Sequence, residues 1–440
     1  MCAIECIYDI EIRKQYSKDK SSCKAVIPKG VFFPKTTLEV SEIVKKSLND
    51  NFNISIWGAG SGVNGGAIPQ DSEEFVISLQ KMDKVEILEH DFIGRAQCGV
   101  NTLYFQQKCE EKGLFFPPDP ASADISSIGG NLACSAGGMR GYKYGTFRDY
   151  VIKITFVDGK GNIITTGCET FKWVTGYDFV RLLTGSEGTL GIITEASFKL
   201  IPGNIVKTSI YINFESMDIL VAGFLKLMKN SIIPSNAEFM DSYTLNVIKE
   251  YLPCEHKNNG CVLLLEIDSY SYENLENDLK KFKKLAQGWD YIISDNEEVS
   301  HNLWKGRKRL RTELEKVKPN VFSEDFVLLY SKIPDFIRFT EEICNKNNIF
   351  FCNFGHIIDG NIHFSSVYEN DEEKRHIEKI IYKISEYVIS NGGTISGEHG
   401  IGKYKRELMI KEIGQKNVDI MQSVKKVFDP HNILNKGKIF

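Results

Sequence analysis

Three segments rich in glycine and other small residues, all within the first 200 residues, limit most narrowly what this chain can fold into. They cover residues 58–66, 126–138 and 184–192. Small residues leave backbone N–H groups exposed, and such groups can cradle phosphate oxygens or lie against a flat ligand. One segment of this kind is commonly a turn. Three of them close in sequence predict a site for one large phosphate-bearing ligand.

The first segment contains the pattern Gly-x-Gly-x-x-Gly between Gly60 and Gly65. In a dinucleotide-binding Rossmann turn this pattern opens a helix whose N-terminus binds the pyrophosphate. Here Pro69 and the strand-like run 75–79 follow, so no such helix is available. The sequence therefore disfavours an NAD-type site. Taken alone, this segment also leaves a merely flexible turn as an alternative.

Length and charge exclude several classes of protein. The 440 residues suggest about three units, and a net charge of −4 argues against a nucleic-acid protein that works through global basicity. No apolar run approaches the roughly 18 residues that span a bilayer, and the acidic first residues do not form a secretory signal. We expect a cytoplasmic protein without a transmembrane segment. A peripheral position on the inner face of the membrane stays open.

The eleven cysteines are scattered and include no Cys-x-x-Cys pair. Iron–sulfur and zinc–thiolate sites need closely spaced thiolates, and a chain without an export signal keeps its thiols reduced. We therefore expect free, mostly buried thiols and no iron–sulfur cluster.

The hydrophobic pattern predicts an α+β fold in which the composition changes at Pro202–Gly203. Short strand-like runs are expected before this point at 54–57, 75–79, 85–88 and 152–157, with helices at 37–48 and 103–112. After it, the pattern predicts strands at 205–213 and 261–268 and helices at 217–229, 272–287 and 416–428. The predicted domains are residues 1–203, residues 204–400, and a C-terminal segment, 401–440.

The segment from Asn353 to Phe364 carries two histidines on either side of an Asp-Gly pair. Asp359-Gly360 flanked by apolar residues is a strong two-residue hairpin signal. With this pair at the turn, His356 lies directly opposite His363, with Cβ atoms about 5 Å apart. The pair could then share one divalent ion. Two alternatives stay open: a pair of satisfied core histidines, and a turn on Gly360-Asn361 that breaks this register.

A third ligand is expected from the glycine-flanked pair Glu398-His399. Neighbouring residues of extended backbone point to opposite sides, so Glu398 can face a metal while His399 faces a substrate. Two histidines and one carboxylate leave coordination positions open for substrate oxygens. An exposed polar turn is the alternative interpretation.

These motifs together resemble a known family. Residues 57–67, Pro118-Asp119-Pro120 leading into 128–131, Tyr144-Gly145 and 185–191 resemble the FAD-binding domain of the vanillyl-alcohol oxidase/para-cresol methylhydroxylase (PCMH) superfamily. Gly-His-x-x-Asp-Gly-Asn-x-His at 355–363 and Gly-Glu-His-Gly at 397–400 narrow the resemblance to the FAD-linked D-2-hydroxyacid dehydrogenases. This family includes D-lactate dehydrogenase, D-2-hydroxyglutarate dehydrogenase and the glycolate oxidase catalytic subunit. The resemblance covers nearly the whole chain.

The resemblance implies a PCMH-type FAD-binding domain of two α+β subdomains, an α+β substrate (cap) domain with an antiparallel sheet, and a C-terminal helical segment that returns to the FAD domain. It implies FAD, with the first and third glycine segments flanking the pyrophosphate and the second contacting the flavin. Some members of the superfamily attach the flavin covalently, but the sequence carries no signature for this, and we expect dissociable FAD. The expected FAD-binding residues are Trp57, Gly58, Gly60, Ser61, Gly62, Asn64, Gly65, Pro118, Asp119, Ser122, Gly129, Gly130, Asn131, Ser135, Gly137, Gly138, Tyr144, Gly145, Glu187, Gly188, Gly191, Ile192 and Asn435.

For the chemistry, the resemblance implies a divalent metal (Zn, Mn or Fe) on His356, His363 and Glu398, with His399 as the active-site base. It also implies that Arg307, in Trp-x-x-Arg from Trp304, binds the substrate carboxylate. The residues alone leave a solvated basic helix face equally open for Arg307. The expected reaction is oxidation of a small D-2-hydroxy acid, such as D-lactate or glycolate, to the 2-oxo acid. Metal and base would together remove the hydroxyl proton.

Electrons are expected to pass to an electron-transfer flavoprotein, an iron–sulfur subunit or a quinone, and a homodimer stays open. Two other functions remain: a metal-independent sugar or lactone oxidase of the same superfamily, and a non-catalytic FAD-binding subunit of an oxidase complex.

Three departures from the family pattern bear on the substrate. Ile358 stands where a small residue is usual, Leu329 where proline is common, and Ser323 where 2-hydroxyglutarate enzymes carry a second basic residue.

Overall fold

The computed structural model describes residues 4–254 and 260–440, which form two units. The first unit comprises the residues up to Gly138 together with Gly145–Gly203 and Glu398–Phe440. The second comprises Met139–Tyr144 and Asn204–Gly397. In chain order the second unit is therefore inserted into the first.

The first unit begins with a four-stranded sheet in the order β1-β2-β4-β3, in which β2, β4 and β3 run parallel. Its strands are β1 (Cys6–Ile7), β2 (Gly30–Phe32), β3 (Ile54–Trp57) and β4 (Phe75–Ser78), accompanied by α1 (Ile10–Gln15) and α2 (Thr37–Asp50). Thr36 caps α2 by accepting the backbone N–H of Glu39, and the apolar face of the helix is buried at Val40, Ile43 and Val44.

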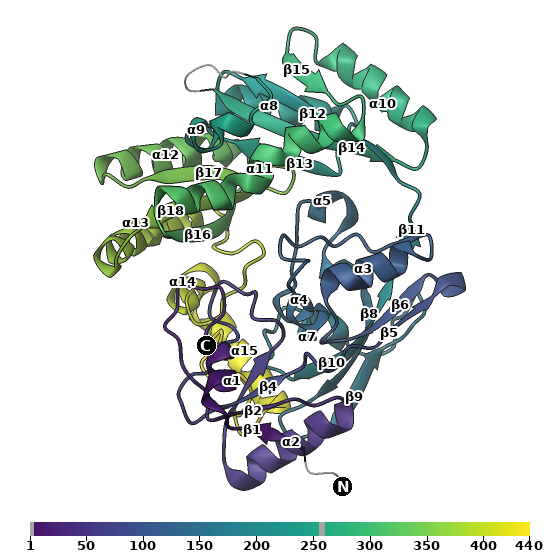
Figure 1. Ribbon diagram of the computed structural model, residues 1–440, viewed down its shortest axis with the longest axis vertical. Coiled ribbons are helices and arrows are strands. Elements are labelled where there is room, and N and C mark those ends of the chain that lie inside the picture. Colours follow the sequence, from purple (N-terminus) through teal and green to yellow (C-terminus); the bar gives the residue numbers. More distant parts are fainter. Residues whose placement is uncertain (1–3, 255–259) are drawn as a thin grey trace. The chain divides into compact units, whose positions relative to one another are not determined.

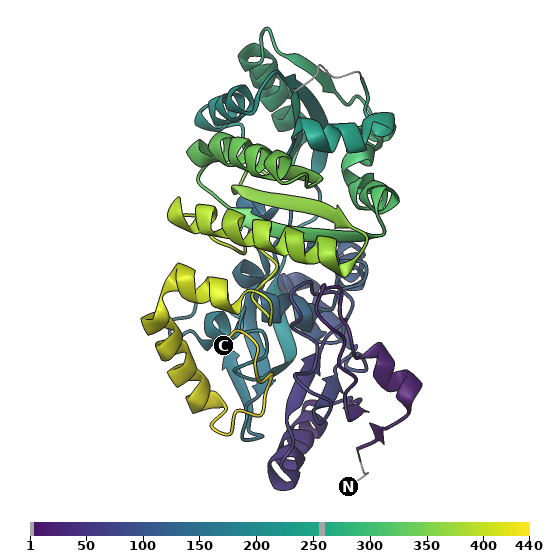
Figure 2. The same cartoon turned by 90° about the vertical axis from the view of Figure 1, so that its left-hand side faces the viewer.

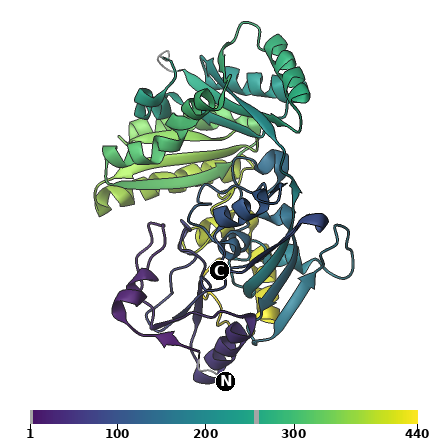
Figure 3. The ribbon, with the colours of Figure 1, turned by 45° about the vertical axis from the view of Figure 1, so that its right-hand side comes forward.

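A five-stranded antiparallel sheet completes this unit, and Figure 3 shows its later strands in blue and teal. Its order is β5 (Val85–Leu88), β6 (Ile93–Gln97), β10 (Ile192–Lys199), β8 (Val151–Val157) and β9 (Ile163–Gly167). The remaining elements before the second unit's sheet are η1 (Glu89–Asp91), α3 (Thr102–Glu110), β7 (Leu114–Phe115), α4 (Ile128–Cys134), α5 (Gly141–Tyr144), α6 (Phe147–Tyr150), α7 (Phe179–Leu183) and β11 (Ile201–Pro202). One hydrophobic core joins the two sheets, with α2 packed against both β8 and β10.

The C-terminal segment packs inside the first unit, where its yellow ribbon lies beside the purple N-terminal strands (Figure 1). Its helices are α14 (Arg406–Ile413) and α15 (Gln415–Phe428). After α15, the backbone extends the edge of β3: Ile54 N–H donates to the Ile433 carbonyl, and Asn435 N–H donates to the Ile54 carbonyl, both at 2.8 Å. Residues from the two ends of the chain thus share one sheet edge.

The second unit is built on a seven-stranded antiparallel sheet. Its order is β15 (Asp290–Ile293), β12 (Val206–Phe214), β14 (Cys261–Ser269), β13 (Asn236–Met240), β17 (Phe351–His356), β18 (Asn361–Tyr368) and β16 (Asn320–Val327). Its helices are α8 (Met217–Lys229), α9 (Ser242–Val247), η2 (Lys249–Tyr251), α10 (Tyr272–Leu285), α11 (Glu297–Val317), η3 (Tyr330–Lys332), α12 (Ile333–Lys346) and α13 (Asp371–Ser390).

Helices cover both faces of this sheet. On one face, Trp304 and Leu310 of α11 share a core cluster with Leu264 of β14. On the other face, α12 packs against β16 through Phe336 and Phe326, whose rings lie 5.9 Å apart, and α13 lies along the same strands (Figure 2). The face with α11 carries the polar residues described below.

The structure confirms the predicted fold class, and several elements match their predicted bounds, among them β3, β5 and α8. Part of the second glycine-rich segment forms the short helix α4, which Ser127 caps by accepting the Gly130 N–H. The ten described cysteines are not joined in disulfides; five of them are buried and five half-buried, and Cys2 lies outside the described residues. No helix in the described part of the chain has the length and apolar character needed to cross a membrane.

Candidate functional site

A cavity of 290 Å³ in the first unit is lined by all three glycine-rich segments. This volume lies just below the range of about 300–1,000 Å³ that is usual for ligand pockets. Fourteen of the expected FAD-binding residues line it: Gly58, Gly60, Ser61, Gly62, Asn64, Ser122, Gly129, Gly130, Asn131, Gly137, Glu187, Gly188, Gly191 and Asn435. The fold thus brings together segments that are up to 377 residues apart in the sequence.

Glycine is required at the cavity wall because the backbone approaches other groups closely. At Gly60, where φ is +68°, a Cβ atom would lie 2.3 Å from the Trp57 ring. At Gly188, where φ is +71°, it would lie 2.7 Å from Nδ2 of Asn435. A larger residue at either position would change the shape of the wall.

The other expected FAD-binding residues do not line this cavity: Trp57, Gly65, Pro118, Asp119, Ser135, Gly138, Tyr144, Gly145 and Ile192. Trp57 is buried beneath the first segment, against Tyr16. Tyr144 belongs to the second unit, where its hydroxyl donates to Oδ2 of Asp268 at 2.6 Å. Burial and the Asp268 carboxylate together raise the pKa of Tyr144.

The segment that carries His399 is held against this cavity by two of its lining residues. Asn64 donates through Nδ2 to the carbonyls of His399 and Gly400, at 3.0 and 2.5 Å. Glu187 accepts the N–H groups of Ile401 and Gly402, at 2.6 and 2.8 Å. Both Glu398 and His399 also line the cavity, so the expected base lies at its wall.

The predicted two-residue hairpin is wrong in its turn. Strand β17 ends at His356, β18 begins at Asn361, and the turn contains the four residues Ile357–Gly360. His363 consequently pairs with Phe354 instead of His356. A register shift of two residues leaves side chains on the same face of a sheet, whereas a shift of one reverses them. The two histidines are therefore diagonal neighbours on one face.

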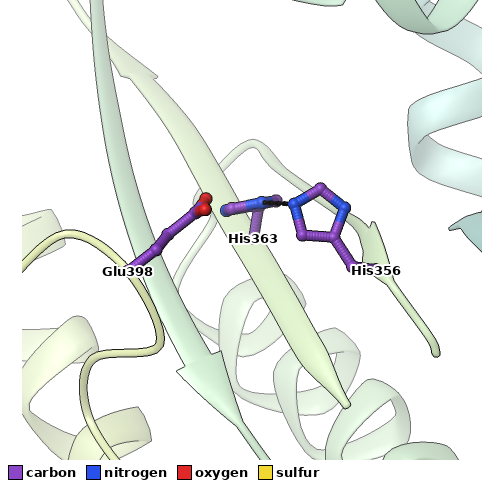
Figure 4. Close-up of side chains that lie close together, drawn as sticks. All are labelled: His356, His363 and Glu398. Atoms are coloured by element: carbon purple, nitrogen blue, oxygen red, sulfur yellow. Dashed lines mark hydrogen bonds between the residues drawn. The ribbon is translucent and has the colours of Figure 1, made fainter. Parts of the chain in front are cut away.

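Their imidazoles still meet. The Nε2 atoms of His356 and His363 lie 3.3 Å apart, and Figure 4 shows the two rings turned toward each other from β17 and β18. Both side chains are buried. Tetrahedral coordination at Zn–N distances of 2.0–2.1 Å would require about 3.4 Å between two ligand nitrogens. The spacing therefore fits two ligands of one metal ion.

A buried carboxylate that the sequence did not indicate lies behind His356. Glu238 of β13 is directly opposite His356 in the sheet, and its Oε1 contacts Nδ1 of that ring. Its other oxygen, Oε2, accepts Nε–H of Arg307 at 2.6 Å. Burial alone would raise the pKa of the Glu238 carboxyl, but the neighbouring His356 and Arg307 side chains outweigh it and hold that pKa well below its ordinary range.

Arg307 differs from its basic neighbours on α11. Its guanidinium lies over the Phe354 ring, 4.6 Å from the ring centre, and points toward the polar face of the sheet. Lys305 and Arg309 instead lie over the ring of Tyr251, and Arg311 pairs with Glu315. Arg307 therefore belongs to the same cluster as the two histidines, which favours the interpretation as a binding residue over a solvated face.

Glu398 directly follows Gly397, the last residue of the second unit. One ligand atom from each of His356, His363 and Glu398 lies within 4.8 Å of the others (Figure 4). Two imidazole nitrogens and one carboxylate suit Zn, Mn or Fe. The residues present thus fit the expected metal in kind and in spacing.

The three residues that depart from the family pattern all lie in the second unit. Ile358 is fully buried, and its carbonyl accepts the Tyr330 hydroxyl at 2.6 Å. Ser323 shares a hydrogen bond with Ser365. Leu329 is 67% exposed.

Comparison with known proteins places the chain in a family. The profile described as "FAD binding domain" matches residues 28–167, and the profile described as "FAD linked oxidases, C-terminal domain" matches residues 204–439, more than half of the chain. The chain therefore belongs to the FAD-linked oxidases, and it is an FAD-dependent oxidoreductase.

Three curated relatives are similar over nearly their whole length. Glycolate oxidase subunit GlcD of Bacillus subtilis is 36% identical, over 97% of this chain and 92% of the relative. D-lactate dehydrogenase of Anaerostipes hadrus is 32% identical (98% and 93%), and D-2-hydroxyglutarate dehydrogenase of Stutzerimonas stutzeri is 30% identical (98% and 95%).

Solved structures support the fold. p-Cresol methylhydroxylase with substrate bound superposes with a TM-score of 0.83 at 16% identity, over 99% of this chain and 93% of that one. 4-Ethylphenol oxidase of Gulosibacter chungangensis superposes with a TM-score of 0.79 at 15% identity, over 99% and 94%. These confirm a PCMH-type fold. The glycine-lined cavity, with closely approaching backbone, fits the FAD that this family binds.

Proposed function

We propose that this enzyme oxidises a small D-2-hydroxy acid, of the size of D-lactate or glycolate, to the 2-oxo acid. The observation that carries the proposal is the cluster of Arg307, Glu238, His356 and His363 on one face of the second unit's sheet. It combines a cation for a carboxylate with two nitrogen ligands for a divalent metal. Relatives that are named as D-lactate, glycolate and D-2-hydroxyglutarate enzymes support the substrate class.

Each of the chain's own residues has one task in this proposal. Arg307, whose Nε is already held by Glu238, would bind the substrate carboxylate through its remaining N–H groups. His399 at the cavity wall would accept the proton of the substrate hydroxyl, since a histidine pKa lies near neutrality. His356, His363 and Glu398 would hold the metal, whose charge would make that hydroxyl more acidic.

FAD, when bound by the first unit, supplies the acceptor for the hydride that leaves the α-carbon. Residues 58–66, 126–138 and 184–192 would orient it through backbone N–H groups and close packing. Its electrons would pass onward to a protein acceptor, such as an electron-transfer flavoprotein or an iron–sulfur subunit, or to a quinone. The relative from Bacillus subtilis is itself named as a subunit.

The test is an anaerobic screen of the purified enzyme against D- and L-2-hydroxy acids, with the visible absorbance of the flavin as the signal and metal analysis of the same sample. We expect bleaching by at least one small D-2-hydroxy acid, and its loss after chelation and in His399→Ala. Bleaching by sugars or lactones that survives chelation would replace the proposal with a metal-independent oxidase. A chain that holds FAD and is bleached by no hydroxy acid would be a flavin-binding subunit.

A further inference from the structure

We infer that Glu238 is a positioning residue that fixes the metal ligand His356 and the carboxylate-binding Arg307 with one buried carboxylate. This inference rests on the proposed function and deepens it, because it couples metal binding to substrate binding. The two oxygens of Glu238 have different partners: Oε1 contacts Nδ1 of His356, and Oε2 accepts Nε–H of Arg307.

The contact with His356 determines which nitrogen of the ring can bind a metal. Oε2 of Glu238 accepts Nε–H of Arg307 and Oε1 lies against Nδ1 of His356, so the carboxylate acts as an acceptor on both sides and Nδ1 carries the hydrogen. In the neutral ring, the lone pair then lies on Nε2, which is the atom that faces His363. A carboxylate behind a ligating histidine fixes its tautomer and orientation and makes it a stronger ligand. Glu238 is placed for this task by the β13–β17 ladder, in which it lies opposite His356.

The contact of Glu238 with Arg307 leaves the terminal N–H groups of the guanidinium available for a substrate carboxylate. Only Nε is bound to Glu238, while Phe354 supports the plane of the group from below. Arg307 comes from α11, and its long side chain would otherwise have many rotamers. With Nε held, fewer of them remain, so less entropy is lost when a substrate carboxylate binds.

The full burial of Glu238 supports its role as a positioning residue. Its side chain has no exposed surface, while that of Arg307 is 18% exposed. A buried carboxylate is strongly unfavourable unless it is paired. Replacing Glu238 should therefore disturb both partners together, whereas replacing Arg307 should disturb substrate binding alone.

The test compares metal affinity, measured by competition with a chromogenic chelator for Zn²⁺ or Mn²⁺, with KM and kcat. In Glu238→Gln the amide has only one accepting oxygen, so it can serve one partner. We expect metal affinity to fall by about 10- to 100-fold and KM to rise in the same variant, with FAD content unchanged. In Arg307→Met, KM should rise while metal affinity stays close to that of the wild type.

Glu266→Gln is the matched control. Glu266 is a second buried carboxylate on the same face of this sheet, but it pairs with Lys207. This variant should keep metal affinity and KM. If Glu238→Gln does not fold because Arg307 loses its anion, Glu238→Gln/Arg307→Met is compared with Arg307→Met, and the double variant should still bind metal more weakly.

Equal metal affinity in the variants with and without Glu238 would overturn the inference and leave the proposed function intact. A rise in KM of Glu238→Gln without a change in its metal affinity would likewise overturn the inference and leave the proposed function intact. A wild-type enzyme that binds neither metal would overturn the proposed metal centre, and the inference with it.

Discussion

The carboxylate of Asp325 holds the backbone of Gly397: its Oδ2 accepts the Gly397 N–H at 2.7 Å. Asp325 is fully buried and lies opposite His363 in the ladder of β16 and β18. Because Gly397 directly precedes Glu398, this hydrogen bond fixes the backbone next to the third proposed metal ligand.

Asp325→Ala should therefore weaken metal binding although Asp325 is not among the proposed ligands. We expect metal affinity to fall several-fold and the free energy of unfolding to fall by about 1–3 kcal/mol, because a partly buried N–H loses its acceptor. Chelator competition and thermal melting measure the two effects. Ser323→Ala, on the same strand and face, is the control. Unchanged metal affinity in Asp325→Ala would contradict this role.

His363→Ala should remove most of the metal. Because changes behind a ligand already cost about 10- to 100-fold, loss of a ligand should lower affinity by more than about 100-fold. The flavin spectrum should remain, since the glycine-lined cavity lies in the other unit. Elemental analysis after dialysis is the measurement, and His376→Ala, on the exposed face of α13, is the control. Full metal content in His363→Ala would sink the proposed centre.

Gly60→Ala should lower FAD affinity by about tenfold or more, a cost of at least about 1.4 kcal/mol. The new Cβ would meet the Trp57 ring at 2.3 Å and displace the first glycine-rich segment. Gly176 has a similar φ of +83° and no atom near its position, so Gly176→Ala carries the backbone strain without the clash. Flavin fluorescence on titration with FAD should separate the two variants. Equal affinities would show that the close approach at Gly60 is unimportant.

Asn435 lies in the C-terminal segment, and Asn435→Ala should weaken FAD binding. The Asn435 side chain accepts the Ile56 N–H at 2.8 Å and donates to the Glu187 carbonyl at 2.6 Å, so it links β3 to the third glycine-rich segment. We expect a loss of about 1–3 kcal/mol in the free energy of unfolding and a lower FAD content. Asn432 and Asn435 both have a positive φ, of 50° and 43°, but Asn432 is exposed, so Asn432→Ala is the control. An effect of equal size in both variants would contradict the link.

Glu169→Gln should change how stability depends on pH. Arg95 donates two hydrogen bonds to Glu169, and these lower the pKa of its carboxyl from 4.5 to about 2. Because the pKa in the folded protein is depressed, the stabilisation is complete above about pH 4.5 and is lost as the pH falls toward 2. At pH 7 the variant should melt about 1–3 °C below the wild type, since a partly exposed pair contributes less than about 1 kcal/mol.

The difference in Tm between wild type and Glu169→Gln should then narrow when melting is repeated between pH 4.5 and pH 3. Glu86→Gln removes the more exposed partner of the same Arg95 and should have a smaller effect at pH 7. A difference that widens as the pH falls would show that Glu169 does not act through its charge.

The two histidines show how far sequence alone can lead. The Asp359-Gly360 signal predicted that they share one face, and this holds because the observed register differs by two residues. The turn itself was mispredicted. Gly360 has a φ of +79°, its carbonyl accepts the Leu328 N–H, and a Cβ there would meet the Leu328 carbonyl at 2.2 Å, so a distant strand end shapes this turn. A local motif contains no information about that neighbour.

Glu238 lies beyond local sequence reasoning for a similar reason. It is 118 residues before His356, in a strand whose surrounding residues are ordinary for a buried sheet. Only the strand order, in which β13 neighbours β17, brings the two together. By contrast, the glycine-rich segments are recognisable in the sequence itself, because close backbone approach requires small residues wherever it occurs.

The edge that Ile433–Asn435 adds to β3 means that the flavin-binding unit is completed only by residues that follow the inserted unit in the chain. A fragment that stops at Gly203 contains every glycine-rich segment, yet it would leave Glu187 without the N–H groups of Ile401 and Gly402. During synthesis, this unit can therefore close its sheet edge only after the ribosome has passed through the whole inserted unit.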